Sequence, residues 1–416
     1  MENMKKKSVQ QNMIYNTVGS LVYYFGLWAM TIIVKRLSGF GDVGIFNAAI
    51  NTTAPAAVIG LFNIRSFQVS DLKGEYLEHT YIYSRFYTNL LSFLICIILC
   101  FAYGYDIKTS IVILLFMVYK LAEAAADVYY GLDQKNERLD YAGISLTIRG
   151  IGTFALFFMI YAMTKNLVLA IAAMAVFSFA VILVYDRRVS SQFLIEKRSV
   201  FSMFQKSEIL KVKNLLIICA PLAIVSFLNN LSLTIPKTFL ERYYGHDIFG
   251  IYASVSSPTV VVQLAATTLF APLIPAMALR YQQGEKKEFV KIMVKFFSII
   301  LGLTIIALIG AAFIASPVLI LLFKADIAPY TNLFLPMLII AALIAVNASF
   351  FSICTLMREI KLQYLVGIIG LLVAFLLSVT IVKQYDLVGT IIAFIGTLVV
   401  QIAVQIILVI RKVQKM

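Results

Sequence analysis

Residues 14–34 read IYNTVGSLVYYFGLWAMTIIV, an apolar run with no charged side chain. A helix of about 20 such residues crosses about 30 Å of hydrocarbon. The strands of a membrane barrel would instead alternate apolar and polar residues over about ten positions. The run therefore predicts a membrane-spanning helix. Because it is too long for a signal peptide and has no small-residue cleavage site, we expect an uncleaved first span.

Runs of the same kind recur along all 416 residues, of which 61% are hydrophobic and only 13% are charged. The mean hydropathy is +0.91. A soluble domain needs about half of its residues to be apolar, so the excess must face lipid. The runs predict an all-α polytopic membrane protein with about twelve spans, at residues 14–34, 43–63, 81–104, 109–131, 141–163, 166–185, 214–235, 248–270, 291–315, 330–356, 361–382 and 388–410.

The distribution of lysine and arginine sets the orientation of these spans. With the N-terminus inside, 25 of the 35 Lys and Arg fall on the cytoplasmic side and 8 on the outer side. The positive-inside rule describes such a bias over short loops. We therefore expect a multi-pass protein of the bacterial cytoplasmic (inner) membrane, with both termini cytoplasmic. Topology and contact with anionic membrane lipids account for the net charge of +14, so no nucleic-acid partner is expected.

The chain also repeats itself after 206 residues. Residues 36–39 (RLSG) align with 242–245 (RYYG), and residues 44–46 (GIF) align with 250–252 (GIY). Each set lies at the outer end of the first helix of a six-span half, and an even number of spans makes the repeats parallel. The expected domains are an N-terminal six-helix bundle, a basic cytoplasmic linker and a C-terminal six-helix bundle, at residues 1–186, 187–213 and 214–416.

The second helix of each half contains a proline, Pro55 in one and Pro258 in the other. Interrupted helices in corresponding places point to a transport cavity. An ordinary kinked packing helix explains a proline in a membrane span equally well, so both interpretations stay open.

Four charged residues are expected inside the membrane: Lys120, Glu123 and Asp127 in one span and Arg149 in the next. At 100° per residue the first three lie within about 60° of one another, so one face of that helix is ionic. Glu123 and Arg149 are expected at similar depth, about 12 Å, and could pair. The set is then either a self-neutralising structural cluster or a place where Lys120 and Arg149 bind an anionic substrate.

A second set of cations lies at the ends of the spans. Arg36 and Arg242 occupy equivalent outer positions of the two halves, with Lys237 nearby, and Arg65 and Arg85 lie at the cytoplasmic mouth. Guanidinium groups suit the oxygens of a phosphate. Any one of these side chains could instead reach out to lipid headgroups. Their recurrence in both halves favours substrate binding for the group.

Amide side chains form the last candidate set, Asn47, Asn51 and Asn229. Within a membrane such groups either hold helices together, at about 1 kcal/mol each, or line a cavity that binds sugar.

Three common sequence motifs for nucleotide binding, zinc-dependent proteolysis and serine hydrolysis are missing from the sequence. It contains no G-x-x-x-x-G-K-[ST], no H-E-x-x-H and no G-x-S-x-G, so neither ATP hydrolysis at a P-loop nor a metal site is expected. The four cysteines all fall within predicted spans, where small apolar packing is the favoured role.

Several motifs in the first 85 residues resemble those of one known family. They are residues 35–39 (KRLSG), 41–47 (GDVGIFN), 60–71 (GLFNIRSFQVSD) and 83–85 (YSR). These stretches resemble the polysaccharide (Wzx-type) flippases for O-antigen and capsule repeat units. That family belongs to the multidrug/oligosaccharidyl-lipid/polysaccharide exporter superfamily. The resemblance covers the whole chain in topology.

The resemblance implies a MATE-like fold, in which two pseudo-symmetric six-helix bundles face a central cavity that opens alternately to each side. It implies an undecaprenyl-diphosphate-linked oligosaccharide as substrate, moved from the inner to the outer leaflet. No cofactor is implied beyond a coupling ion, H⁺ or Na⁺, for which Glu123 and Asp127 are the candidates by analogy. A polysaccharide polymerase or export machinery is an implied partner.

Two other functions remain as alternatives. A cation-coupled multidrug exporter of the same superfamily would favour an acidic, aromatic cavity, whereas the charges expected here are balanced or basic. A membrane glycosyltransferase or polymerase would need a large outer loop, and every predicted outer loop is short. The transporter is therefore preferred to an enzyme.

Overall fold

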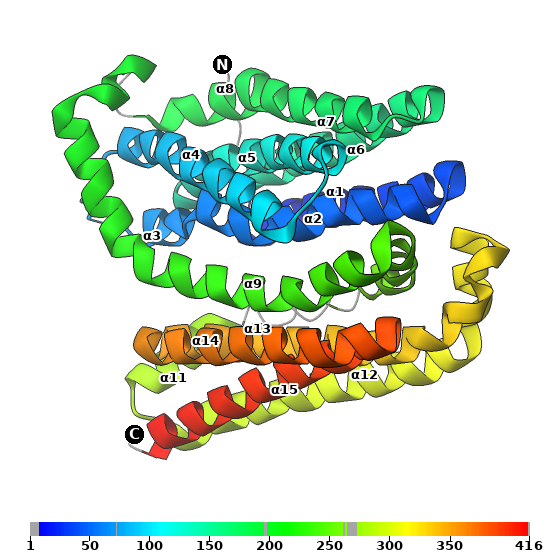
Figure 1. The fold of residues 1–416 in the computed structure, drawn as a ribbon. Helices are drawn as coiled ribbons and strands as arrows, with labels where there is room; N and C mark the ends of the chain where they lie inside the picture. Colours follow the sequence, from blue (N-terminus) through cyan, green and yellow to red (C-terminus); the bar gives the residue numbers. More distant parts are fainter. Residues whose placement is uncertain (1–7, 72, 195–197, 261–262, 264–272, 415–416) are drawn as a thin grey trace. The chain divides into compact units, whose positions relative to one another are not determined.

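The computed structural model describes residues 8–71, 73–194, 198–260, 263 and 273–414. These residues form an all-helical structure with no strands, as the apolar runs predict (Figure 1). The lysine-rich segment 1–7 and part of the predicted span 248–270 lie outside the described residues.

The first part of the chain contains eight α-helices, joined near their end by one π-helix, η1, and one 3₁₀ turn, η2. Their bounds are α1 (Val9–Ser38), α2 (Phe40–Leu61), α3 (Ile64–Ser70), α4 (Glu78–Tyr103), α5 (Ile107–Lys135), α6 (Leu139–Thr164), α7 (Leu167–Val181), η1 (Ile182–Asp186), α8 (Arg187–Ser190) and η2 (Ser191–Phe193).

The rest of the described chain continues with long helices and short 3₁₀ or π segments. Their bounds are η3 (Val200–Phe204), α9 (Lys206–Ser256), η4 (Ser257–Thr259), α11 (Leu273–Gln282), α12 (Lys286–Phe323), η5 (Ala325–Leu333), α13 (Phe334–Leu356), α14 (Ile360–Leu377), η6 (Ser378–Val382) and α15 (Lys383–Gln414). The predicted prolines lie inside α2 (Pro55) and within η4 (Pro258).

Nine helical segments of the described chain are long and apolar enough to cross a membrane. Two of them, Lys206–Thr259 and Ile360–Gln414, are 54 and 55 residues long, about twice the length that one crossing needs. Each contains a break, at Gly245 with φ 81° and at Asp386 with φ 41°. When these two are divided and the ionic helix α5 is counted, the fold agrees with about twelve spans. The chain is a multi-pass membrane protein.

Local sequence determines where several of these helices begin and end. Gly104 adopts φ 68° after α4, a left-handed conformation that glycine accepts without strain. Asp106 then accepts hydrogen bonds from the backbone N–H groups of Lys108 and Thr109 and so caps α5. Asn166 caps α7 in the same way.

The described chain packs as two compact units. The first extends up to Leu37 and from Ala48 to Phe227, and the second combines Ser38–Asn47 with the residues from Leu228 onward. These limits differ from the domain boundaries expected from the sequence. The beginning of α9 packs into the first unit, where Leu215 and Cys219 belong to the same buried apolar cluster as Ile59 and Tyr81. Packing thus places the basic linker inside the first unit.

Within the first unit, α1 and α6 cross at very short distance. A Cβ on Gly19 would lie 2.2 Å from the carbonyl oxygen of Gly143, and one on Gly26 would lie 3.0 Å from that of Gly150. Small residues allow the backbones of membrane helices to approach in this way. The seven-residue spacing on both helices keeps the glycines on one seam.

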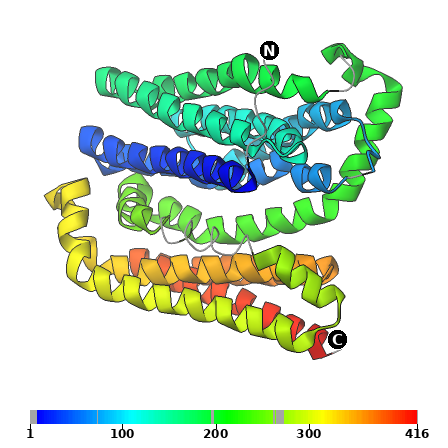
Figure 2. The ribbon, with the colours of Figure 1, turned by 180° about the vertical axis from the view of Figure 1, so that it is seen from behind.

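In the second unit, α12, α13, α14 and α15 lie alongside one another in both views (Figures 1 and 2). Their apolar core includes Phe289, Phe296, Ile353 and Val409. The four cysteines of the chain are buried and unpaired, as expected for small apolar packing.

Candidate substrate-binding site

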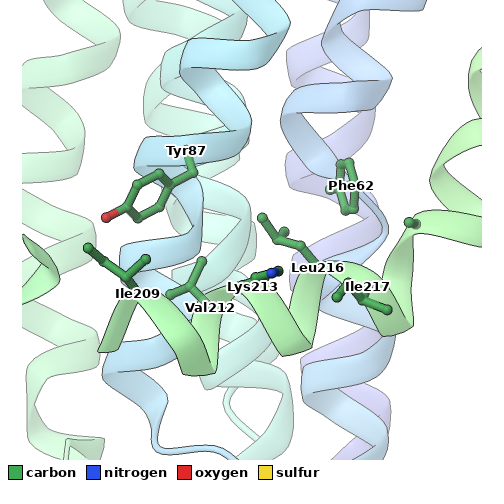
Figure 3. Close-up of a pocket in the computed structure, with 8 residues that line it drawn as sticks. Phe62, Tyr87, Ile209, Val212, Lys213, Leu216 and Ile217 are labelled. Atoms are coloured by element: carbon green, nitrogen blue, oxygen red, sulfur yellow. The ribbon is translucent and has the colours of Figure 1, made fainter. Parts of the chain in front are cut away.

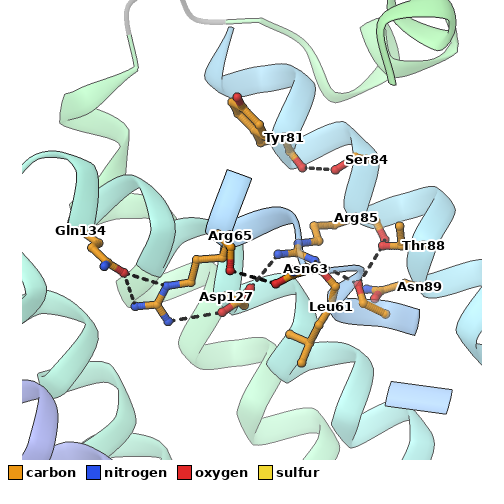
Figure 4. Close-up of polar contacts among 12 residues, drawn as sticks. Leu61, Asn63, Arg65, Tyr81, Ser84, Arg85, Thr88, Asn89, Asp127 and Gln134 are labelled. Atoms are coloured by element: carbon orange, nitrogen blue, oxygen red, sulfur yellow. Dashed lines mark hydrogen bonds and ion pairs between the residues drawn. The ribbon is translucent and has the colours of Figure 1, made fainter. Parts of the chain in front are cut away.

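Asp127 on α5 binds two arginines from neighbouring helices (Figure 4). Its Oδ2 lies 2.7 Å from Nη2 of Arg85 on α4, and its Oδ1 lies 3.3 Å from Nη1 of Arg65 on α3. Two of the predicted site residues, Arg65 and Arg85, are therefore brought together on a third, Asp127. Their charges exceed that of the carboxylate by one.

Arg85 is buried at the point where α2 ends. Phe62 and Asn63 have φ of 46° and 53°, so the helix stops at Leu61 and leaves carbonyl groups without partners. Arg85 Nη1 donates to the carbonyl oxygens of both Gly60 and Leu61. The guanidinium thus caps the end of α2 as well as pairing with Asp127.

Arg65 is the more accessible of the two arginines, with 29% of its side chain exposed against 4% for Arg85. Its Nε and Nη2 donate to Gln134 Oε1 at 3.1 and 2.9 Å. The group is held in place by neutral and charged partners but still reaches solvent-accessible space, which a phosphate-binding arginine requires.

Lys120 and Glu123 form an ion pair one turn apart on α5, with 2.7 Å between Nζ and Oε2. Glu123 also accepts a hydrogen bond from the Tyr23 hydroxyl, which in turn contacts the hydroxyl of Tyr119. About a fifth to a quarter of each charged side chain is exposed. The ionic face of α5 is thus directed partly toward α1.

Arg149 forms its ion pair with Asp186, and the pair with Glu123 that equal depth would allow does not form. Arg149 Nη2 lies 2.7 Å from Asp186 Oδ2, and both side chains are 2% exposed. Depth along a helix fixes the height of a side chain but not the direction in which it points, so equal depth did not imply contact. Asp186 was missed because it follows the predicted span 166–185 and directly precedes the predicted linker 187–213, so it was not expected inside the membrane. In the structure the helix continues through the π-helix η1 to this residue.

The predicted amide Asn229 belongs to a buried network in the second unit. Asn347 Nδ2 donates to Asn229 Oδ1 at 3.2 Å and to Gln401 Oε1 at 3.3 Å. Gln401 Nε2 then donates to Ser232 Oγ at 3.0 Å. Gly370 leaves room for this amide, since a Cβ there would lie 2.0 Å from Gln401 Nε2. These hydrogen bonds join α9, α13 and α15, as amides between membrane helices do, although Asn347 Oδ1 has no hydrogen-bond partner among the described residues.

The two predicted amides of α2 lie in different surroundings. Asn47 donates to the backbone carbonyl of Val43, one turn earlier on its own helix, at 3.0 Å. Asn51 is buried, with 4% of its surface exposed.

The three site cations predicted on the outer side differ in how far their side chains are exposed. Arg36 and Arg242 are exposed. Lys237 is half-buried, and its Nζ lies 5.6 Å from the centre of the Phe394 ring. Across the residues that the structure describes, Lys237 has no ion pair with a carboxylate. Arg242 likewise has no ion pair among the described residues, but its side chain is exposed, whereas that of Lys237 is half-buried.

Known proteins resemble this chain in both sequence and fold. Residues 64–282, just over half of the chain, match a family described as "Polysaccharide biosynthesis protein". The chain is 27% identical over 383 residues to the capsular polysaccharide biosynthesis protein CapF of Staphylococcus aureus, covering 91% of this chain and 93% of that protein.

Two solved structures share the fold. One is an inward-facing multidrug resistance MATE family transporter of the MOP superfamily, with a TM-score of 0.69 and 12% identity over 97% of this chain and 99% of that one. The other is a MOP superfamily transporter from Pyrococcus furiosus, with a TM-score of 0.63 and 12% identity over 99% of this chain and 96% of that one. At these identities the likeness concerns the fold alone, and it agrees with the MATE-like architecture expected from the sequence.

Proposed function

Because the chain belongs to the polysaccharide biosynthesis protein family, we propose that it flips undecaprenyl-diphosphate-linked oligosaccharide repeat units from the inner to the outer leaflet. One combination of findings carries this proposal: a chain from a biosynthetic family has the fold of an exporter. A transporter that serves polysaccharide synthesis must move a sugar-bearing intermediate across the membrane. Alternating access, in which the cavity opens to one side at a time, is the mechanism that such a fold supports.

The charge of this substrate lies in its diphosphate, and cations with incomplete pairing are the groups suited to bind it. Lys237 has no carboxylate partner within the described chain, and Arg65 shares one carboxylate with Arg85. Arg149 and Lys120 each have a carboxylate of their own. We therefore rank Lys237 and Arg65 first as phosphate-binding residues and Arg149 last.

The proposed orientation places both termini in the cytoplasm of a bacterium and the spans in its inner membrane. Support comes from the threefold excess of lysine and arginine in the loops assigned to the inside. The polysaccharide polymerase or export machinery would then receive the substrate on the outer side. A terminal tag that is accessible only from outside intact cells would contradict this orientation.

Coupling to H⁺ or Na⁺ is proposed for Glu123 rather than Asp127. Asp127 already pairs with two guanidinium groups, those of Arg65 and Arg85. Glu123 is bound by one lysine and by the hydroxyl of Tyr23. Glu123 therefore has one cationic partner to give up for a coupling ion, whereas Asp127 has two.

Reconstituted vesicles provide the test. We expect the purified protein to transfer a labelled undecaprenyl-diphosphate oligosaccharide between leaflets, measured by its accessibility to an added glycosidase. A cation-coupled multidrug exporter is the second candidate, since MATE transporters share the fold. Efflux of a cationic dye without transfer of the lipid would favour that candidate. Unchanged transfer by Lys120→Ala and Arg149→Ala would remove both residues from the binding site.

A further inference from the structure

A surface cavity of about 310 Å³ lies in the first unit, between the beginning of α9, the helix α4 and the residue that follows α2 (Figure 3). This volume is at the low end of the range of ligand-binding clefts, about 300–1,000 Å³. Ile209 and Ile217, at the edges of the cavity, are 41% and 60% exposed. The cavity is therefore open to what surrounds the protein and is not an internal void.

The wall of the cavity is apolar because of how its three segments are held. Phe62 adopts a left-handed conformation after α2 and presents its ring to Leu216 (Figure 3). The Tyr87 hydroxyl donates to the backbone carbonyl of Met203 at 2.9 Å. Its polar end is thereby satisfied, and the rest of the ring lines the cavity beside Val212.

One charged side chain, Lys213, lines this apolar wall. It is exposed, and among the described residues it makes neither an ion pair nor a side-chain hydrogen bond. Its neighbour Lys211 differs, since it pairs with Glu208 at 2.8 Å, as does Arg198 at 2.9 Å. Lys213 lies between Ile209 and Ile217 along α9, so the apolar part of its side chain contributes to the wall (Figure 3). An apolar groove beside one uncompensated cation complements a ligand that has an apolar chain and an anionic head.

We propose that this groove binds the lipid carrier itself, with the first isoprene units of a polyprenyl diphosphate in the cavity and Lys213 on its phosphates. The inference rests on the proposed function and names a subsite for the lipid part of that substrate. A cavity of about 310 Å³ suits part of a single chain, whereas a phospholipid would have to place two. Because Lys213 is the last residue of the basic linker 187–213, the site would hold the carrier on the side where the linker lies.

The experiment uses the full-length protein in nanodiscs and a photoreactive analogue of geranylgeranyl diphosphate, which has the chain and the diphosphate but no sugar. We expect labelled peptides from α4 and the first turns of α9. Geranylgeranyl diphosphate should compete for labelling, and inorganic diphosphate or geranylgeraniol alone should compete poorly. Labelling elsewhere, or equal competition by phosphatidylglycerol, would overturn the proposal in favour of bulk lipid contact.

Two variants and one control sharpen the result. Lys213→Gln should weaken labelling by about tenfold, since it removes one charge-assisted contact. Ala220→Phe should fill the cavity and prevent labelling. Lys211→Gln makes the same charge change on the other side of the helix and should leave labelling unchanged. Equal loss in Lys213→Gln and Lys211→Gln would contradict the site, and because Lys213 is exposed its replacement does not disturb packing.

Failure of this proposal can be told apart from failure of the proposed function. Specific labelling of the groove without any transfer of the oligosaccharide lipid would keep the carrier site and refute the flippase. Transfer that continues unchanged in Lys213→Gln and Ala220→Phe would keep the flippase and refute the site.

Discussion

Gly44 and Gly250 pack against each other's helices in a reciprocal way. A Cβ on Gly44 would lie 1.9 Å from the carbonyl oxygen of His246, and one on Gly250 would lie 2.0 Å from that of Phe40. Phe40 and His246 are themselves separated by 206 residues, the repeat found in the sequence. Each glycine thus meets the carbonyl four residues before its own counterpart, which is the contact expected of two helices related by a pseudo-twofold axis.

Replacing Gly44 by alanine should destabilise this crossing. The added Cβ would overlap a backbone oxygen, which no rotamer change can relieve, so the two helices must separate. We expect a loss of about 1–3 kcal/mol of stability, the usual cost of overpacking. Thermal unfolding of the detergent-solubilised protein, followed by size-exclusion fluorescence, measures it.

Gly310→Ala is the matched control for that substitution. A Cβ at Gly310, within α12, would have no atom within 4 Å. Alanine is the better helix former by about 1 kcal/mol, so the control should be neutral or slightly stabilised. Equal melting temperatures for Gly44→Ala and Gly310→Ala would show that the close crossing is absent.

Breaking the Arg149–Asp186 pair should be costly, whereas removing both partners should not. Arg149→Met leaves a buried carboxylate without its partner, and the expected loss is about 3–5 kcal/mol. The double variant Arg149→Met with Asp186→Leu should recover most of that stability, since the charges are removed together. A double variant as unstable as the single one would indicate that Arg149 has a further buried partner.

The two arginines on Asp127 should respond differently to truncation. Arg85→Ala removes the cap of α2 together with a buried ion pair, and we expect a loss of about 3–5 kcal/mol. Arg65→Ala removes a pair that is partly exposed, for which about 1 kcal/mol is expected. Thermal unfolding of both variants tests the ranking, and a larger loss for Arg65→Ala would reverse our assignment of roles.

The helices could be predicted because their signal is local. A run of about twenty apolar residues can satisfy its backbone in lipid only as a helix, so length alone identified most spans. The repeat that relates Gly44 to Gly250 was likewise visible in the sequence, although their reciprocal contact was not predicted. These features depend on the sequence of one segment or on its comparison with another.

Partners inside the bundle could not be predicted in this way. The contact of Arg149 with Asp186 depends on the rotation of two helices about their axes and on a π-helical turn that extends one of them. The capping of α2 by Arg85 depends on the left-handed conformation of Phe62, which a phenylalanine in the sequence does not predict. Neither rotation nor unusual backbone conformation has a strong local signature.

Stability should depend on pH through Asp71, in the loop between α3 and α4. Burial raises its pKa, but hydrogen bonds from the backbone N–H of Glu75, from the Tyr81 hydroxyl and from the N–H of Tyr76 outweigh this, so the pKa is lowered. A lowered pKa stabilises the fold above the ordinary carboxyl value of about 3.9, and the effect is lost as pH falls through the folded pKa.

The variant Asp71→Asn should therefore melt below the wild type at pH 7, and the difference should shrink as the pH is lowered toward about 4 and beyond. Asparagine keeps one acceptor oxygen, but its amide NH₂ group takes the place of the other oxygen. That NH₂ group would face N–H or O–H groups that also donate hydrogen bonds. A difference in melting temperature that stays constant across this range would show that the charge of Asp71 is not what holds the loop.

Lys237→Gln should impair transport without impairing the fold. The Lys237 side chain is half-buried near the Phe394 ring and has no carboxylate partner in the described chain. No ion pair there offsets the free-energy cost of desolvating its charge. Removing the charge should leave the melting temperature unchanged or raise it.

If the ammonium group of Lys237 binds the diphosphate, the half-saturation concentration for transfer of the lipid-linked oligosaccharide should rise by about tenfold in Lys237→Gln. Lys237→Arg should restore it in part. Lys383→Gln, an exposed lysine of the same unit, is the control for net charge and should behave as the wild type. A fall in melting temperature that parallels the loss of transport would assign Lys237 to packing and leave Arg65 as the leading phosphate-binding residue.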